Sequence, residues 1–319
     1  MKIVILDRST LGSDVDLSEL DQFGEITSYD YTSDEETVPR LRDCDIVITN
    51  KVLITKDVID NCDLKLICVS ATGTNNVDVE YAKHKGIEVK NVAGYSTSSV
   101  AQLTFSLVLN FMQKLDYYRD YVKSGSWNNS KIFTHIDKPF NELNGKTWGV
   151  IGLGNIGEKV ANIASSFGCN ISYYSTSGMN YNTNYNSTNL TNLIETSDII
   201  SIHCPLNNKT KDLLNYENMK LLKNNAIIIN VARGGIINEY DITKIMEEKN
   251  LYFGLDSIEN EPMDKETPLN NILDNDNIVI TPHIAWASIE AREKLIKGIC
   301  ENIKGFIDGW ASNKITVTI

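Results

Sequence analysis

The sequence predicts an α/β protein made of two doubly wound units, each built around a parallel sheet. Three observations predict this class. Short β-branched runs alternate with helix-like segments along the whole chain. These runs are nearly continuously apolar, as strands covered by helices on both faces must be. At 319 residues the chain is also longer than a usual single domain, so two domains are expected.

The first third of the chain contains one series of predicted strands. We expect them at Lys2–Asp7, Asp45–Asn50, Leu64–Ser70 and Glu88–Val92. A stretch of small residues follows, and apolar residues at helical spacing then predict one long amphipathic helix over Ser99–Lys123.

A second series of strands occupies the rest of the chain. We expect these strands at Trp148–Ile151, Asn170–Ser175, Ile199–Cys204, Ala226–Val231, Tyr252–Ile258 and Asn277–Thr281. The polar tract 180–192 is predicted as a surface loop, and Ile289–Trp310 as a final helix. We expect roughly the last 30 residues to return to the first domain, since a chain that leaves and re-enters a domain supplies two hinge crossings.

Composition excludes several classes of protein. The net charge of −12 argues against nucleic acid as a partner, because the phosphates would be repelled. No apolar run reaches the ~18 residues of a membrane helix, and the start of the chain resembles a strand more than a signal peptide. The six cysteines are scattered without CxxC pairs, which predicts reduced thiols, a cytoplasmic protein and no metal site.

Gly152–Gly157 (Gly-Leu-Gly-Asn-Ile-Gly) is a dinucleotide fingerprint in the right context. It directly follows an apolar strand and opens a predicted helix, Glu158–Phe167. Gly152 permits the tight turn, Gly154 lets the backbone approach a pyrophosphate, and Gly157 lets helix and strand pack closely. A glycine turn in another kind of α/β protein is the alternative, and the strand before and helix after make it the weaker one.

The residues at the end of the next strand do not decide whether the cofactor carries a 2′-phosphate. NAD enzymes usually carry an acid roughly 20 residues past the fingerprint, to bind the adenosine ribose. Here the stretch from Tyr173 to Gly178 has only hydroxyl groups, with Ser175 in the place of the acid. Because no cation is present to neutralise a 2′-phosphate, NAD is preferred, and NADP stays open.

Strand ends in the second series carry the candidate catalytic residues. Arg233 precedes two glycines, and its planar fork can hold a carboxylate and polarise a carbonyl. Asp256 ends a strand, where it could accept a hydrogen bond from a nicotinamide carboxamide. Glu259 and Glu261 both compete to orient His283, which follows another strand, and spacing alone does not choose between them.

Two other stretches have weaker signals. His203 is interpreted as a packing residue at a strand end whose backbone faces the cofactor. Ser70–Asp78 is a small-residue turn whose backbone amides could bind a carboxylate, although an ordinary turn between strand and helix explains it equally well.

Together these motifs resemble the D-isomer-specific 2-hydroxyacid dehydrogenase family, and most closely its glycerate dehydrogenase (hydroxypyruvate reductase) branch. The resemblance covers nearly the whole chain. It rests on Leu6–Arg8, Thr49–Lys51, Ala71–Asp78, Gly94–Thr97, Gly152–Gly157, Ala232–Gly234, Glu261-Pro262 and Pro282–Ser288.

The resemblance implies a flavodoxin-like catalytic domain at 1–98 and 287–319, and a Rossmann NAD-binding domain at 99–286. It implies a homodimer through the nucleotide-binding domain and its long helix. It also implies a catalytic set of Arg233, Glu261 and His283, which favours Glu261 over Glu259. The implied substrate contacts are Lys51, Thr72, Gly73, Thr74, Arg233 and His283. The implied cofactor contacts are Gly152, Gly154, Asn155, Ile156, Gly157, Ser175, Cys204, Pro205, Thr210, Val231, Ala232, Arg233, Asp256, His283 and Ala285.

Departures from the family refine the expected substrate. Many NAD-using members have Asp where this chain has Ser175. Phosphoglycerate dehydrogenases tend to carry Arg where this chain has Lys51, which loses the bidentate fork and favours an unphosphorylated substrate. The resemblance therefore implies hydride transfer between NAD(H) and a small D-2-hydroxy acid, with D-glycerate and hydroxypyruvate as the best pair and glyoxylate as a secondary substrate.

Three alternative functions are considered less consistent with these residues. A phosphoglycerate dehydrogenase is the nearest, although its long forms have a regulatory C-terminal domain and this chain ends at Ile319. An NADH-sensing corepressor has the same fold and triad, but the sequence has no basic patch for chromatin partners. Formate dehydrogenase is disfavoured, because that relative has Gln where this chain has Glu261.

Overall fold

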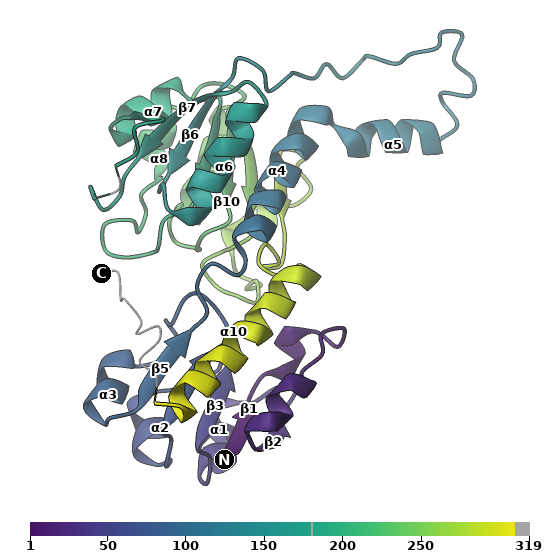
Figure 1. Cartoon of the computed structure of the whole chain (residues 1–319). Coiled ribbons are helices and arrows are strands. Elements are labelled where there is room, and N and C mark those ends of the chain that lie inside the picture. The colour runs from purple at the N-terminus through teal and green to yellow at the C-terminus, as the bar shows by residue number, and fades with distance from the viewer. Residues whose placement is uncertain (180, 310–319) are drawn as a thin grey trace. The chain divides into compact units, whose positions relative to one another are not determined.

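The computed structural model describes residues 1–179 and 181–309, and it divides into two compact units (Figure 1). The first, called here the terminal unit, comprises Met1–Ser96 and Ala287–Ile319. The second, the central unit, comprises Thr97–Trp286. The chain thus leaves the terminal unit once and returns to it for its last helix.

The described part of the terminal unit has a parallel sheet of five strands in the order β2-β1-β3-β4-β5. The strands are β1 (Lys2–Ile5), β2 (Glu25–Ser28), β3 (Ile46–Thr49), β4 (Leu66–Val69) and β5 (Glu88–Asn91). The helices are η1 (Arg8–Leu11), η2 (Ser18–Phe23), α1 (Asp34–Leu41), α2 (Lys56–Asp60), α3 (Val79–His84) and α10 (Ile289–Ile307). α10 packs on β4 and β5, and strands β3 and β4 are buried along their whole length, as their apolar sequences predict.

The described part of the central unit has a parallel sheet of seven strands in the order β12-β11-β10-β9-β6-β7-β8. The strands are β6 (Thr147–Ile151), β7 (Asn170–Tyr174), β8 (Asn186–Ser187), β9 (Ile199–Ile202), β10 (Ile227–Asn230), β11 (Tyr252–Leu255) and β12 (Ile278–Ile280). The helices are α4 (Thr97–Gln113), α5 (Leu115–Lys123), α6 (Asn155–Ser166), α7 (Leu190–Thr196), α8 (Tyr216–Met219), α9 (Glu239–Glu248) and η3 (Pro268–Ile272).

The core of the central unit forms around its first strand. Trp148 is fully buried, packs against Phe105 of α4, and donates its indole N–H to Ser201 Oγ at 2.9 Å. α4 lies beside α6 and covers β10 and β11 (Figure 1). Because all strands run parallel, their carboxyl ends lie at one edge of the sheet, and the loops after them meet there.

Two predicted elements were wrong. The single helix over Ser99–Lys123 is two helices, α4 and α5, because Lys114 adopts a left-handed backbone with φ of 51° that ends the first helix. α5 therefore leaves α4 in a new direction (Figure 1). The expected loop 180–192 instead contains the short strand β8 and the start of α7, since Ser172 and Tyr173 of β7 pair with Asn186 and Ser187.

The remaining differences lie at the edges of elements. The strand series of the first third lacked β2, whose exposed polar residues at the sheet edge have no apolar pattern to mark them. The last helix ends at Ile307, and Trp310, its predicted end, lies outside the described residues. Within residues 1–179 and 181–309, no helix combines the length and apolar character needed to cross a membrane.

Candidate active site

The glycine turn after β6 is shaped by close backbone contacts. Gly152 has φ of 90°, and a Cβ there would lie 2.8 Å from the backbone nitrogen of Cys204. A Cβ on Gly157 would lie 2.2 Å from the Gly152 carbonyl oxygen. By contrast, a Cβ on Gly154 would meet nothing within 4 Å. Packing therefore requires the first and third glycines, whereas the second leaves open space at the start of α6, where backbone amides can bind phosphate.

These residues fit a dinucleotide. Gly154 is the N-cap of α6 and has no side chain to occupy the helix N-terminus. Asn155 and Ile156 form the first turn, so their amide groups are directed out of the helix toward the open space. The predicted pyrophosphate contacts at residues 152–157 thus lie on one turn.

The loop after β9 borders the same glycine turn. The His203 backbone N–H donates to the Ile151 carbonyl at 2.8 Å, which brings Cys204 against Gly152. Thr210 is fully buried, and its hydroxyl donates to the Pro205 carbonyl at 2.6 Å and accepts from the Asn207 N–H. The Thr210 side chain is thus used to close the loop, and any contribution it makes to a cofactor site comes through the shape of that loop.

His203 is more unusual than its sequence signal indicated. Both ring nitrogens are buried and have no hydrogen-bond partner among the described residues. Burial lowers the pKa of this imidazole to about 3. The ring is therefore neutral and behaves as a packing group at physiological pH.

Strand β7 ends beside Ser175, the predicted ribose contact. The Gly178 N–H donates to the Ser175 carbonyl, so residues 175–178 form a turn. The sequence from Tyr173 through Asn192 has no Lys, Arg, Asp or Glu. This region offers hydroxyl and amide groups to a ribose, and no charge that would select for or against a 2′-phosphate.

His283 and Glu261 form a pair in the central unit. His283 Nδ1 lies 2.7 Å from Glu261 Oε2. The side chains are 22% and 28% exposed, so both are partly withdrawn from water yet accessible. Glu259, the competing acid, is exposed and does not take this position. The geometry is that of a carboxylate orienting an imidazole, with Nε2 left for proton transfer.

The backbone at His283 is held in an uncommon conformation by a buried aspartate. His283 has φ of 54°, in the left-handed region that few residues other than glycine adopt. Asp256 is 2% exposed, and its carboxylate accepts the backbone N–H groups of Ile284 and Ala285, both at 2.8 Å, and the Thr281 hydroxyl at 2.6 Å. These bonds fix the residues on both sides of His283.

Asp256 thus has a role that the sequence did not reveal. Oδ1 accepts from two donors and Oδ2 from one, so one acceptor position stays available for the predicted nicotinamide contact. The sequence signal for this role was an acidic residue at the end of one apolar strand, followed by a histidine at the end of the next apolar strand. Only the pairing of β11 with β12 shows that the two loops meet.

Arg233 lies on a turn that presses against the loop carrying Glu261. Asn230 shapes this turn: its side chain donates to the Arg233 carbonyl at 2.7 Å and accepts the Ala232 N–H at 3.1 Å. A Cβ on Gly234 would lie 2.0 Å from the Ile258 carbonyl, so only glycine permits the two backbones to touch. Val231, buried directly after β10, anchors the turn. Sequence reasoning missed Asn230, whose polar side chain sits within an apolar run.

The predicted substrate contacts in the terminal unit lie on two loops. Lys51 is exposed on the loop after β3, whose backbone is held by Asp7. Thr72 is tied to the end of β5 by its hydroxyl, which donates to the Val92 carbonyl at 3.2 Å. Gly73 and Thr74 follow in the turn after β4. The terminal unit thus presents Lys51, Thr72, Gly73 and Thr74 from neighbouring strand ends.

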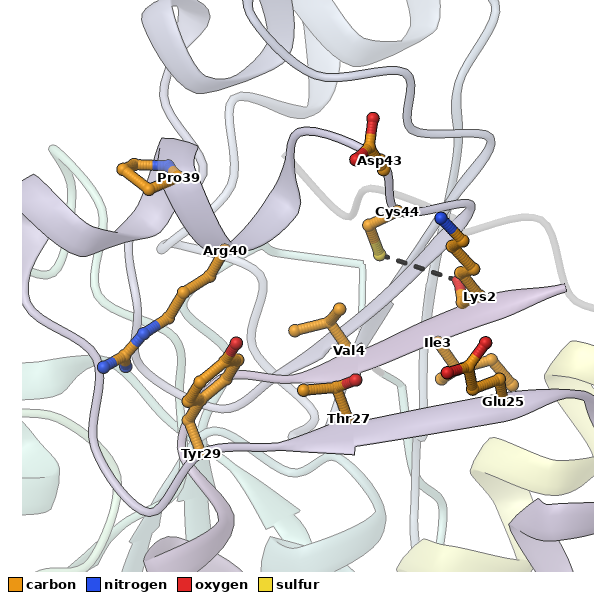
Figure 2. A pocket seen from close by; sticks show the side chains of 10 residues that line it. All are labelled: Lys2, Ile3, Val4, Glu25, Thr27, Tyr29, Pro39, Arg40, Asp43 and Cys44. Carbon is orange, nitrogen blue, oxygen red and sulfur yellow. Dashed lines mark hydrogen bonds between the residues drawn. The ribbon is translucent and has the colours of Figure 1, made fainter.

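Two hollows of the terminal unit do not coincide with these residues. A cavity of about 200 Å³ opens beside β1, β2 and α1, where the Arg40 guanidinium lies over the Tyr29 ring at 4.0 Å (Figure 2). Cys44 borders it, with its thiol directed at the Lys2 carbonyl, and burial raises the pKa of that thiol to about 12. A groove of about 500 Å³ is lined by residues 53–57 and 75–78, next along the chain to Lys51 and Thr74. Neither is lined by a predicted site residue.

Comparison with known proteins identifies the family. Residues 105–285 match the family model for the NAD-binding domain of D-isomer-specific 2-hydroxyacid dehydrogenases. A hydroxypyruvate reductase of Blautia hydrogenotrophica is 36% identical over 325 residues, covering 99% of each chain.

Solved structures with the same fold also include enzymes complexed with NAD or NADPH. An acyclic imino acid reductase, Bsp5, in complex with NADPH and D-Arg has a TM-score of 0.86 at 29% identity, covering 98% of this chain and 99% of the other. The D-lactate dehydrogenase of Aquifex aeolicus, complexed with NAD and lactic acid, has a TM-score of 0.84 at 26% identity, covering 97% and 96%. The glycine turn, the His283–Glu261 pair and these matches agree: the chain belongs to the D-isomer-specific 2-hydroxyacid dehydrogenase family, and it is an oxidoreductase with that family's NAD-binding domain.

Proposed function

We propose that this enzyme reduces hydroxypyruvate to D-glycerate with NADH, and glyoxylate more slowly, with Arg233, Glu261 and His283 as its catalytic residues. The observation that carries the proposal is the 2.7 Å contact between His283 Nδ1 and Glu261 Oε2, on a turn fixed by Asp256. A histidine held in this way can deliver a proton at one defined position.

The proposed mechanism assigns one task to each side chain. The Arg233 guanidinium binds the substrate carboxylate and polarises the neighbouring carbonyl oxygen. Bound NADH supplies the hydride for the carbonyl carbon. Protonated His283 gives a proton from Nε2 to the developing alkoxide, because its Nδ1 is engaged by Glu261. The Glu261 carboxylate stabilises the imidazolium before transfer, and in the reverse reaction His283 accepts the hydroxyl proton.

The preference for hydroxypyruvate rests on two supports. The hydroxypyruvate reductase of Blautia hydrogenotrophica matches this chain from end to end. Lys51 in the terminal unit offers a single ammonium group, which suits a small unphosphorylated acid better than a phosphate that Arg would bind through two bonds. The backbone amides of Gly73 and Thr74 are proposed to bind the substrate carboxylate.

A matrix of substrates and cofactors tests the proposal. The initial rate of cofactor oxidation is measured with hydroxypyruvate, glyoxylate, pyruvate and phosphohydroxypyruvate, each with NADH and with NADPH. We expect the highest kcat/KM for hydroxypyruvate with NADH. A highest value for phosphohydroxypyruvate would favour the phosphoglycerate dehydrogenase alternative, and absence of turnover with every acid would favour an NADH-sensing binding protein.

We also propose a homodimer formed through the central unit. α5 has no buried residue, and apolar side chains on it and on the following segment are left in contact with solvent. The most exposed are Leu115 (61%), Ile132 (65%), Phe133 (89%) and Ile136 (71%). A second copy of the chain would cover these exposed apolar side chains. Sedimentation equilibrium should give twice the mass of the chain.

We propose a cytoplasmic location on the basis of the thiols. All six cysteines are free, and five of them are buried. A reducing compartment maintains such thiols without a disulfide requirement. Fractionation of cells that produce the protein tests this, with cytoplasmic recovery expected.

A further inference from the structure

Glu239 is a buried carboxylate that the proposed mechanism does not use. It is the first residue of α9, directly after the N-cap Asn238, and only 7% of it is exposed. Buried carboxylates are costly unless hydrogen-bonded, so each contact that it makes carries information.

Its two oxygens hold the two ends of one loop. Glu239 Oε1 accepts the backbone N–H of Glu259 at 2.5 Å, and Oε2 accepts the Thr267 hydroxyl at 3.2 Å. The residues between these two points form the loop that carries Glu261. Glu239 therefore closes this loop at its base.

The position of Glu261 depends on that closure. Glu261 Oε1 accepts the Ile258 N–H at 3.2 Å, next to the residue that Glu239 holds, while Glu261 Oε2 contacts His283. Gly234, beside Arg233, is pressed against the same Ile258–Glu259 backbone. A shift of this backbone would move Glu261 away from His283, and it would also disturb the turn of Arg233.

The charged surroundings of Glu239 are acidic. Burial raises the pKa of Glu239, as do the neighbouring carboxylates of Glu259 and Glu261, while the bonds from Glu259 and Thr267 act in the opposite direction. η3, which packs on α9, has no charged residue. α8 also packs on α9, and the backbone N–H of its Tyr216 donates to Asp241 rather than to Glu239. A carboxylate at position 239, close to the carboxylates of Glu259 and Glu261, indicates that its two acceptor oxygens are needed there.

We propose that Glu239 is a positioning residue. The hydrogen bonds that its carboxylate accepts from Glu259 and Thr267 set the distance between Glu261 and His283. This inference rests on the proposed function, because it assigns Glu239 to the Glu261–His283 pair. It concerns geometry, so the neutral amide of Gln, which can accept from the Glu259 N–H and donate to the Thr267 hydroxyl, should replace Glu.

The experiment compares Glu239→Ala, Glu239→Gln and the matched control Asp241→Ala. Asp241 lies in the same first turn of α9, but its side chain accepts the Tyr216 N–H, away from the loop. We expect Glu239→Ala to lower kcat by about 10- to 100-fold with KM changed less than about threefold, because a misplaced acid–base pair mainly costs turnover. Glu239→Gln and Asp241→Ala should keep most of the wild-type kcat.

A second readout does not need activity. In protein labelled with ¹⁵N-histidine, the Nδ1 chemical shift of His283, assigned with His283→Asn, reports the contact between the ring and Glu261. Glu239→Ala should move this Nδ1 chemical shift toward that of a Glu261→Ala variant, in which the contact is absent, and Glu239→Gln should keep the wild-type value. Thr267→Val, which removes one of the two contacts, should show the same change to a smaller extent and serves if Glu239→Ala does not fold.

The outcomes are distinguishable. Absence of wild-type turnover contradicts the proposed function, and the Nδ1 chemical shift of His283 still decides the role of Glu239. An unchanged Nδ1 chemical shift in folded Glu239→Ala or Thr267→Val overturns the inference. So does a Gln variant as impaired as the Ala variant, since the geometric argument requires rescue.

Discussion

Two buried aspartates, one in each unit, occupy equivalent places in their sheets. Asp7 follows β1 in the terminal unit, and Asp256 follows β11 in the central unit. Each accepts backbone N–H groups of the loop after the neighbouring parallel strand, which is β3 for Asp7 and β12 for Asp256. In both units a carboxylate at a strand end thus fixes the loop that carries a candidate site residue, Lys51 or His283.

The two loops differ in what the carboxylate must hold. Asp7 accepts from three successive N–H groups, those of Asn50, Lys51 and Val52, and this loop has no positive φ. Asp256 binds the residues on either side of His283, which has φ of 54°. The first arrangement places Lys51, the proposed binding group, whereas the second also maintains a strained backbone at His283, the proposed proton-transfer group. Loss of Asp256 should therefore reduce turnover, and loss of Asp7 should mainly weaken substrate binding.

The largest loss of turnover is expected for His283→Ala. This loss sets the upper limit for the loss expected from Asp256→Ala. Removing the proposed proton donor should lower kcat for hydroxypyruvate reduction by on the order of 10²–10⁴, with the affinity for NADH, measured by fluorescence titration, little changed. A variant that turns over like the wild type would remove His283 from the mechanism, and with it the significance of the turn that Asp256 holds.

Asp256→Ala should come next. Releasing Ile284, Ala285 and Thr281 allows His283 to leave its left-handed backbone, so kcat should fall by about 10- to 100-fold, and by less than in His283→Ala. Steady-state kinetics measure the loss, and the double variant Asp256→Ala/His283→Ala should be no slower than His283→Ala alone. Additive losses would show that Asp256 acts independently of His283.

Asp7→Asn should affect KM more than kcat. The amide has one oxygen to receive the N–H groups that the carboxylate accepts, so the Lys51 loop loosens and KM for hydroxypyruvate should rise by about 3- to 10-fold. Burial raises the pKa of Asp7, so in the wild type this carboxyl takes up its proton at a higher pH than an ordinary aspartic acid, and KM should increase there as pH falls. The Asn variant should lack that component of the KM–pH profile.

The smallest effect at neutral pH is expected for His203, a strand-end side chain without partners among the described residues. Burial lowers its pKa to about 3, below the ordinary 6.5. The unfolded chain therefore binds a proton that the folded chain does not, and stability present above pH 6.5 is lost as pH falls from 6.5 toward 3. Urea unfolding at pH 7 and 4.5 should show a loss of about 2–3 kcal/mol that His203→Leu avoids. His84→Gln, at an exposed histidine, serves as the control and should retain the full loss.

Much of the fold followed from local pattern. Apolar runs identified most strands because central strands are covered on both faces, and the glycine fingerprint was found because strand, turn and helix are contiguous in the chain. β2 escaped detection because an edge strand needs no apolar pattern, and the break at Lys114 escaped because apolar spacing continues across it.

The candidate site likewise contains residues that the sequence identified and residues that only the structure revealed. Arg233, Glu261 and His283 were selected by local motifs and by family resemblance, each from its own stretch of sequence. The anchors Asp256, Asn230 and Glu239 were missed in that role, because each holds backbone groups rather than a motif. A backbone N–H or carbonyl group can belong to any residue type in the partner loop, so no residue type marks the partner.

The sequence by itself determined which segments become strands, where the dinucleotide turn lies and which side chains have the chemistry for proton transfer, because these depend on residues close together in the chain. Family resemblance favoured Glu261 over Glu259, and the tertiary structure shows the contact of Glu261 with His283. Only the tertiary structure shows that Asp256 and Glu239 hold the two loops concerned. Those relations join residues 20 or more positions apart, across strands whose order in the sheet is set by the packing of the whole core.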